Sequence, residues 1–585
     1  MKNYYALLIV VLLCIMGVAQ EHTSDGSCGS EYVNQKLVEE DPSFAQRIKE
    51  FDTDLSQMMK SGKKKNFYKA DEDIYEIPIV IHVIHTGEAI GTAYNKSDAD
   101  IHAWVDFTNK VYEGIAPNLV GDPERVSIPI RFVLAKRDMN CNPTNGIVRV
   151  DGSVIPEYAE YGLKYGSSNG VEESQIKALS RWDPNYYYNI YVVNTIGGGS
   201  ISGFAYYAGA STANDGSFMR SSVVGTSNTT FPHEMGHAMG LRHTFDGANN
   251  TGGNCPPTTG DCTIDDDKVC DTERSPSAYS DHPCKTGADI NICTGTYYQG
   301  VQNNIMNYGH CLDRFTEGQK DRAIAQLLQH RESLINSNAG KEPDVTENLN
   351  VKPACVPTSI TNLNNPNNMG PANVTFGDIK YNSKGYNMDG FLFYIDNNDG
   401  TRCYVGTTFT KLKVGVPVPL TISVLYNNQN VRTYIDYNDN GIFDVDTETV
   451  FSTQINANSS ATINVTPPEG AVLNTPLRMR VIADFITSSI SPCYNPLYGQ
   501  IEDFAVILTS SSSCEKVWKG IDDNWDNADN WDPVGVPNSS HCIKIPSVFP
   551  HPVIRGNAEV GSIELIGELK IDAEGHLKVT RGDQL

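Results

Sequence analysis

An eleven-residue run from His233 to His243 contains the residue types of a complete zinc-hydrolase site. On a helix, His233 and His237 are four residues apart, so both imidazoles project from one face and can bind a single Zn²⁺. Glu234 is placed to act as a general base on a water that the metal activates. Gly240 lets the chain leave the helix through a left-handed turn, and His243 then returns as a third ligand. Three protein ligands leave a fourth position open, as in catalytic zinc sites.

A second motif lies downstream, in residues 304–319, and contains Met306 and Tyr308. It resembles the Met-containing turn beneath the metal in metzincin peptidases. Within the metzincins, this segment resembles the pappalysin family. The shared pattern is N-x-M-x-Y, followed by a cysteine and then by F-T-x-x-Q. Residues 188–192 and 203–206 are similar to that family's central strand and its "GFA" segment. The resemblance covers roughly residues 75–335.

The resemblance implies hydrolysis of peptide bonds, with Glu234 passing a proton from the attacking water to the leaving amine. It implies that Tyr308 approaches the metal and stabilises the tetrahedral oxyanion; packing beneath the site is the alternative. Met306 is assigned to the Met turn. An extended substrate is expected to add a strand to the sheet. The residues expected beside that substrate strand are Gly203, Phe204 and Ala205.

The N-terminus has the three parts of a secretory signal peptide, assigned to residues 1–19. Residues 20–70 are predicted to be an exposed pro-peptide, with residues 61–65 as the expected cleavage point. The chain is therefore predicted to be secreted or held at the cell surface, where disulfides form. The apolar run of the predicted signal peptide is too short for a convincing membrane span, and no other apolar stretch of 18 residues exists.

Fourteen cysteines include Cys14 in the signal peptide, so an odd number remains in the mature chain. Cys28, near the mature N-terminus, is the best candidate for the unpaired thiol. Its Cys-Gly pair resembles the pro-peptide of pappalysin-like zymogens, in which a thiolate caps the zinc. A spare cysteine or one paired elsewhere is the alternative, and Asp25 is the fallback ligand.

The 585 residues carry a formal net charge of −25 and are 39% hydrophobic. This length and hydrophobic content suffice for several domains with buried cores. The acidic balance argues against nucleic acid or an anionic membrane surface as a partner. Acidic loops suit hard cations, so calcium is expected in addition to zinc.

The predicted fold is an α+β metzincin-like catalytic domain followed by an all-β sandwich and a short β-rich module. The catalytic domain is assigned to residues 71–335, and residues 336–354, rich in Asn, Pro and Thr, form a linker. Residues 355–510 alternate strands and turns as antiparallel sandwiches do, and their G-Q-I-E-D-F segment resembles the GEVED signature. Residues 511–585 form the C-terminal module, whose tryptophans are expected in its core.

Local patterns predict several elements of the catalytic domain. The apolar run at residues 77–84 indicates a buried strand, and further strands are expected at residues 128–136 and 187–194. Residues 97–100 and 316–319 resemble capping boxes that begin helices.

Two segments have compositions that suit calcium. Residues 255–311 hold six cysteines and several aspartates; two or three disulfides are predicted there, and the family resemblance implies structural Ca²⁺. Residues 436–444 match the first half of an EF-hand loop, although Glu448 falls one place beyond the usual bidentate glutamate. A plain turn is the alternative. The expected ligands of this second loop are Asp436, Asn438, Asn440 and Asp444.

Two classes of function remain. One is a secreted zinc endopeptidase that acts on extracellular proteins or peptides and is made as a cysteine-switch zymogen. The other is a calcium-dependent surface adhesin with a secondary peptidase domain. Glu234 favours the first class, because an adhesin needs no general base. Asp313, close to Cys311, leaves open a preference for substrates with Arg or Lys, since similar enzymes use an acidic side chain there.

Overall fold

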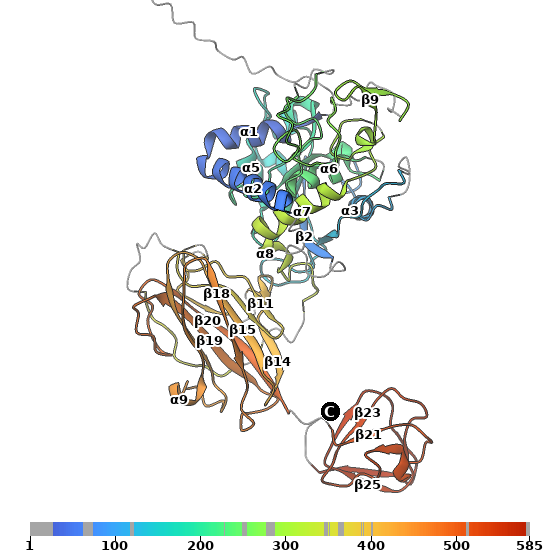
Figure 1. The fold of residues 1–585 in the computed structure, drawn as a ribbon, viewed down its shortest axis with the longest axis vertical. Helices are drawn as coiled ribbons and strands as arrows, with labels where there is room; N and C mark the ends of the chain where they lie inside the picture. The colour runs from blue at the N-terminus through green and yellow to red at the C-terminus, as the bar shows by residue number, and fades with distance from the viewer. Residues whose placement is uncertain are drawn as a thin grey trace, which may run out of the picture. The chain divides into compact units, whose positions relative to one another are not determined.

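A computed structural model of the chain shows its fold (Figure 1). The structure describes residues 27–61, 74–116, 122–226, 228–248, 254–276, 287–309, 311–343, 349, 351–360, 368–387, 389, 391–398, 402–510 and 514–580. The predicted signal peptide, Asp25 and most of the expected cleavage point lie outside these residues. The chain divides into two compact units, the first comprising Met1–Asn348 with Lys380–Asn382 and Asp399–Thr407.

The first unit is built on a seven-stranded mixed sheet with the order β1-β6-β7-β5-β2-β3, in which β4 also pairs with β2. Its strands are β1 (Ser27–Cys28), β2 (Tyr75–His85), β3 (Ile130–Leu134), β4 (Ile147–Asp151), β5 (Tyr188–Val193), β6 (Ile201–Ala205) and β7 (Ser217–Arg220). β2 has parallel neighbours on both edges, namely β5 on one and β3 and β4 on the other. Its apolar run is buried throughout, as such a strand requires. The three predicted strands are confirmed.

The helices of this unit cover the sheet and position the histidines. They are α3 (Asp98–Tyr112), α4 (Tyr158–Tyr161), α5 (Glu173–Ser180), α6 (Thr230–Ala238), α7 (Glu317–His330) and α8 (Glu332–Ile335). Both predicted capping boxes are confirmed, with Ser97 and Thr316 as the N-caps of α3 and α7. α6 contacts β6, β7 and α3. The rings of Trp104 and Phe231, 4.1 Å apart, join α3 to α6, so the histidine-bearing helix is held from two sides.

The N-terminal segment corrects one prediction. Residues 27–61 are not an exposed tail: β1 joins the sheet, and the helices α1 (Ser30–Glu40) and α2 (Pro42–Ser61) pack on the first unit. The physical reason is an apolar stripe at helical spacing along α2, whose members are Phe44, Ile48, Phe51 and Leu55. Phe51 and Leu55 lie against Ala325 of α7. The prediction gave more weight to the Lys-rich residues that follow than to this apolar spacing.

Disulfides hold the loops of the first unit. Cys255 bonds Cys293, and Cys262 bonds Cys270, which confirms the predicted disulfides of this region. The short strands β8 (Ile290–Asn291) and β9 (Thr296–Tyr297) pair beside them. Cys141 bonds Cys403. The strands β11 (Ile379–Tyr381) and β13 (Gly406–Thr407) pair with each other.

The second unit begins with two β-sheets. One contains β10 (Pro371–Phe376), β15 (Val418–Val424) and β18 (Ser459–Val465), all antiparallel. The other contains β12 (Tyr394–Asp396), β14 (Phe409–Lys413), β16 (Gln429–Ile435), β17 (Thr449–Ile455), β19 (Pro476–Phe485) and β20 (Gln500–Thr509). β10 contacts β19 and β20. β12 and β14 run parallel to β20, so the second sheet departs from the purely antiparallel prediction.

The C-terminal module consists of short strands stacked mainly in parallel. β21 (Lys516–Trp518), β22 (Trp531–Asp532), β23 (Cys542–Ile545) and β26 (Ser562–Leu565) form one sheet. β24 (Val553–Ile554) pairs with β27 (Lys570–Ile571), and β25 (Asn557–Val560) pairs with β28 (His576–Val579). Its three tryptophans, Trp518, Trp525 and Trp531, are buried together, which confirms their expected core role. Among the described residues, no helix has the length and apolarity needed to cross a membrane.

Candidate active site

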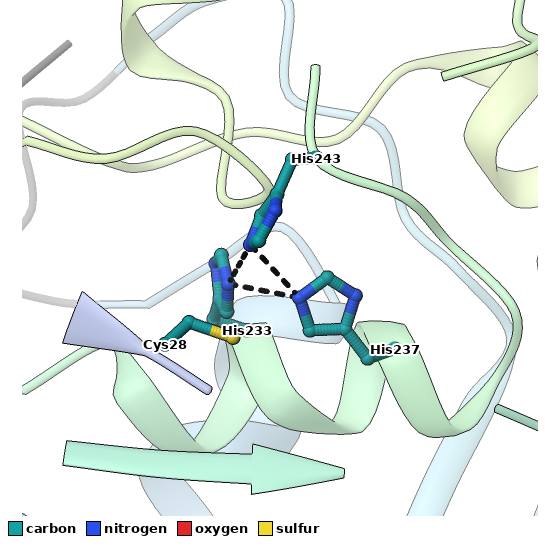
Figure 2. Close-up of side chains that lie close together, drawn as sticks. All are labelled: Cys28, His233, His237 and His243. Carbon is teal, nitrogen blue, oxygen red and sulfur yellow. Dashed lines mark hydrogen bonds between the residues drawn. The ribbon is translucent and has the colours of Figure 1, made fainter. Parts of the chain in front are cut away.

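Three histidines converge at the end of α6 (Figure 2). The Nε2 atoms of His233 and His237 are 3.1 Å apart, and each lies within 3.2 Å of Nε2 of His243. Gly240 carries a φ of +81°, the left-handed turn that the sequence predicts, and it redirects the chain so that His243 faces the helix. The three residues proposed as metal ligands are therefore brought together.

The hydrogen bonds of the other ring nitrogens aim these imidazoles. Nδ1 of His233 lies 2.7 Å from the carbonyl of Ile305, and Nδ1 of His237 lies 2.9 Å from that of Leu241. A carbonyl only accepts, so each Nδ1 carries the proton and each Nε2 keeps a lone pair for the centre. Burial lowers the pKa of His233 to about 4 and also lowers the pKa of His237 and His243. The rings are thus held in the neutral form that binds metal.

Glu234 is fully buried beside the histidines. Its Oε2 accepts hydrogen bonds from Ser30 Oγ at 2.7 Å and Cys28 Sγ at 3.4 Å. Its Oε1 has no hydrogen-bond partner among the described residues. Burial raises the pKa of this carboxyl to about 7, a value suited to a group that gains and loses a proton.

Cys28 lies over the histidines at the end of β1 (Figure 2). Its Sγ and the three histidine nitrogens lie within 4.8 Å of one another. Cys28 is a free thiol, and burial with the nearby Glu234 carboxylate raises its pKa. The sequence-predicted thiol and the histidines therefore form one four-residue cluster.

The Met turn lies against the helix as the motif predicts. A Cβ on Gly236 would lie 2.4 Å from Sδ of Met306, so only glycine fits at this point of α6. The Tyr308 ring packs edge-on to His243 at 4.9 Å, and its hydroxyl donates to the carbonyl of Cys28 at 3.4 Å. Tyr308 thus lies beside the histidine cluster.

β6 presents the edge on which a substrate strand is expected. Cys28 pairs with Gly203 in parallel, and the amide of Gly29 donates to the carbonyl of Gly203 at 2.9 Å. Ser30 Oγ also accepts from the amide of Ala205. Phe204 points into a buried cluster. The N-terminal segment therefore occupies the edge formed by Gly203, Phe204 and Ala205.

Sequence reasoning missed two residues that hold this edge. Asn34 donates through Nδ2 to the carbonyls of Ser30 and Ala205, and its Oδ1 accepts from the amide of Tyr207 at 2.8 Å. Ser30 bridges Glu234 and β6. Neither residue belongs to a recognised motif, and their partners on β6, on Glu234 and on Tyr207 are more than 170 positions away, so no local signal identifies them.

The predicted calcium loop is ordered by its own backbone. Asp436 accepts hydrogen bonds from the amides of Asn440 at 3.1 Å and Gly441 at 2.8 Å. Glu448 accepts from Asn438 Nδ2 at 3.0 Å and from the amide of Asp444 at 2.8 Å. Glu448 therefore joins the loop, although sequence spacing alone left it out.

Two acidic residues of the first unit have protein partners. Asp313 is buried and pairs with Arg125 at 2.6 Å, so it is not available to attract a basic substrate side chain. This removes the reason for expecting a preference for Arg or Lys. Asp271 accepts from Thr316 Oγ1 at 2.7 Å and from the amide of Gly318 at 2.8 Å, so it caps α7.

Comparisons with known proteins agree with this geometry. Residues 170–328 match the family model described as pregnancy-associated plasma protein-A, residues 430–507 match the GEVED domain, and residues 517–585 match a domain of unknown function. The first of these segments includes the strands β5, β6 and β7 and the histidine-bearing helix α6. Residues 170–328 are thus similar to the pappalysin peptidases, and residues 430–507 are similar to the GEVED domain.

Two curated relatives are fungal proteins. An extracellular metalloprotease of Sordaria macrospora is 36% identical over 104 residues, which are 17% of this chain and 30% of that protein. Extracellular metalloprotease 1 of Coccidioides posadasii is 31% identical over 196 residues, which are 31% of this chain and 60% of that protein. The chain therefore spans less than two thirds of either relative.

Solved structures of Tannerella forsythia proteins are also similar. A promirolysin mutant shares 22% identity with a TM-score of 0.39, over 54% of this chain and 99% of that one. Mature mirolysin in complex with a cleaved peptide shares 22% identity with a TM-score of 0.34, over 45% of this chain and 99% of that one.

Proposed function

We propose that this chain is a zinc-dependent endopeptidase that hydrolyses extracellular proteins or peptides and is kept latent by Cys28. The observation that carries the proposal is the convergence of three neutral imidazole nitrogens beside the buried carboxylate of Glu234. The pappalysin-family match and the relatives named extracellular metalloproteases support it.

The residues of the cluster fit zinc. Tetrahedral zinc at about 2.0–2.1 Å from each nitrogen requires nitrogens about 3.3 Å apart, close to the 3.1–3.2 Å separations of His233, His237 and His243. The Nε2 atoms of His233 and His237 cannot donate to each other, because each Nδ1 carries the proton, so their close approach is unfavourable without a cation. Zinc bound here would acidify a water molecule and polarise the scissile carbonyl.

The chain's own residues supply the proton transfers. Glu234 takes a proton from the attacking water through its buried carboxylate and then gives it to the leaving amine. Tyr308, beside His243, donates a hydrogen bond to the developing oxyanion. The substrate backbone pairs with β6 along Gly203, Phe204 and Ala205. Because β6 then gains a strand where residues 27–29 now lie, the N-terminal segment and the substrate exclude each other.

Latency follows from Cys28. Its thiolate would occupy the fourth zinc position, which the attacking water needs. Activation would then require cleavage after the N-terminal segment, with residues 61–65 as the expected point. Export and signal-peptide removal are part of the same proposal, and the disulfides of the chain support an oxidising destination.

For the second unit we infer a β-sandwich over residues 355–510 and calcium at the loop from Asp436 to Glu448. The contact of β10 with β19 and β20 supports the sandwich. The loop brings the carboxylate of Asp436 near that of Glu448, and burial together with this neighbour raises the pKa of Glu448. A calcium ion between them would relieve this repulsion. Calcium in the loop of residues 255–311 stays a prediction.

The test is hydrolysis of a denatured protein by the processed chain. We expect activity that a chelator removes and zinc restores, and that Glu234→Gln abolishes while bound zinc stays at wild-type content. A wild-type protein that binds zinc but cleaves nothing would overturn the proposal and favour the adhesin.

A further inference from the structure

A second polar contact of the N-terminal segment lies away from the histidine cluster. Asp52 of α2 reaches three cations of the first unit: Arg322 at 2.7 Å, Arg242 at 3.1 Å and Lys268. Only 12% of the Asp52 side chain and 4% of that of Arg322 are exposed. A carboxylate buried against three cations is a specific contact rather than a surface ion pair.

The three cations come from separate elements, and the two arginines have further partners besides Asp52. Arg322 of α7 donates through Nε to the carbonyl of Gly240, in the turn that precedes His243. Arg242 pairs with Asp246 at 3.2 Å and stacks over the ring of Tyr207. Lys268 belongs to the loop closed by the Cys262–Cys270 disulfide. These three cations form the receptor for Asp52, and two of them are also positioned by contacts other than Asp52.

The three cations of the receptor have fewer carboxylate partners than they need when Asp52 is left out. Among the described residues, Asp246 is the one further acidic side chain that pairs directly with these cations, whereas Asp267 interacts with Arg322 without a direct contact. Without Asp52, three partly buried cations would have one paired carboxylate between them, which is electrostatically costly. The strongly lowered pKa of Asp52, caused by Arg322, Arg242 and Lys268 against its burial, shows that the receptor favours a charged carboxylate.

Other residues of α2 also make polar contacts with the rest of the first unit. Arg47 donates to the carbonyl of Gly209 at 2.9 Å, Ser56 hydrogen-bonds Thr263 at 2.6 Å, and Lys60 pairs with Asp261 at 2.6 Å. The ring of Phe51 packs beneath the Arg322 guanidinium. Ser56 and Thr263 are also buried, but among the charged contacts of α2 named here the Asp52 contact is more enclosed than the pair of Lys60 and Asp261.

We infer that Arg242, Lys268 and Arg322 form a carboxylate-binding site that holds Asp52 as a second anchor of the N-terminal segment, independent of Cys28. The inference deepens the proposed latency and rests on it only for its consequence. Two anchors separate two tasks: Cys28 closes the metal position, and Asp52 keeps α2 docked when the thiol leaves. The site selects an acidic side chain because guanidinium groups pair with carboxylates.

Hydrogen exchange of the α2 amides in the full chain tests the inference without reference to activity. In Asp52→Asn, we expect these amides to exchange at least about tenfold faster, since breaking a buried ion pair strongly favours opening. The matched control is Asp54→Asn, on the exposed side of the same helix, which should leave exchange unchanged. Lys268→Gln should accelerate exchange in the same direction and add little in the double variant with Asp52→Asn.

A further variant separates the two anchors. Cys28→Ala should leave exchange along α2 within about twofold of wild type. The inference is overturned if Asp52→Asn behaves like Asp54→Asn, or if Cys28→Ala alone frees α2 as much as Asp52→Asn does. Because the readout needs neither metal nor catalysis, failure of the zinc-peptidase proposal would not change these outcomes. Should Asp52→Asn fold poorly, Lys268→Gln carries the same test.

Discussion

Two segments of this chain look like metal sites in the sequence, and they differ in how their donor atoms are satisfied. At the histidine cluster, the Nδ1 atoms of His233 and His237 donate outward, and the three Nε2 atoms face one another beside the Cys28 thiol. In the loop from Asp436 to Glu448, the carboxylates accept from backbone amides of the loop itself. The first arrangement leaves lone pairs that a cation would satisfy, whereas in the second the carboxylates already have hydrogen-bond donors. We therefore expect metal removal to affect the two regions very differently.

The largest expected effect comes from removing one donor of the histidine cluster. His243→Ala should lose bound zinc and hydrolytic activity by more than the roughly 10–100-fold that changes outside the ligand set cause. His102→Ala is the matched control, because His102 is exposed on α3. Metal analysis and peptidase assay measure both. If His243→Ala keeps its full zinc content, His243 is not a zinc ligand and the histidine cluster is not the metal site described above.

Removing the thiol should free the metal position but not the whole cleft. Full-length Cys28→Ala is expected to gain activity over the latent wild type and to process itself, because the fourth position is then open to water. It should remain less active than the processed enzyme, since Asn34 and Asp52 still hold the segment. Asp54→Asn serves as the control. If Cys28→Ala is as latent as wild type, steric burial replaces the thiolate switch.

Tyr308→Phe probes chemistry while leaving the zinc donors untouched. Losing one hydrogen-bond donor to an oxyanion costs about 10²–10³ in kcat, so we expect a fall of that order with little change in KM or zinc content. Steady-state kinetics of the processed enzyme measure it. Unchanged kinetics would leave Tyr308 with a packing role beside His243 and Phe245.

The smallest effect is expected at the loop of the second unit. With an affinity of about 10⁻³ M, typical of extracellular calcium modules, 10 mM calcium would stabilise the domain by about 1.4 kcal/mol. A rise of a few degrees in Tm that Asp436→Asn abolishes would support calcium binding. A Tm that calcium does not change, or changes equally in Asp436→Asn, would assign the loop as a plain turn.

Local patterns predicted much of the catalytic unit. The histidine motif, the Met turn, the capping boxes at Ser97 and Thr316 and the buried run of β2 all act over a few residues, so a single sequence shows them. The dependence of His243 on Gly240 is equally local, since it needs only a left-handed turn.

What the sequence could not show depends on distant partners. Ser30, Asn34 and Asp52 acquire their roles only when the N-terminal segment packs against β6, α6 and α7. In the sequence Asp313 looks available to a substrate, but in the structure it forms an ion pair with Arg125, 188 positions away. Glu448 fails the EF-hand spacing, yet a short helix, α9 (Val445–Glu448), returns it to the loop. In each case tertiary pairing decides the role of a side chain whose local context is uninformative.

The most direct test of the account is X-ray absorption at the zinc edge of the full-length latent chain. We predict three nitrogen ligands at about 2.0–2.1 Å and one sulfur at about 2.3 Å, with the sulfur lost in Cys28→Ala and the nitrogens retained. A spectrum without sulfur in the wild type would contradict the thiolate switch. A spectrum with fewer than three nitrogen ligands would contradict the assignment of His233, His237 and His243 as the metal site.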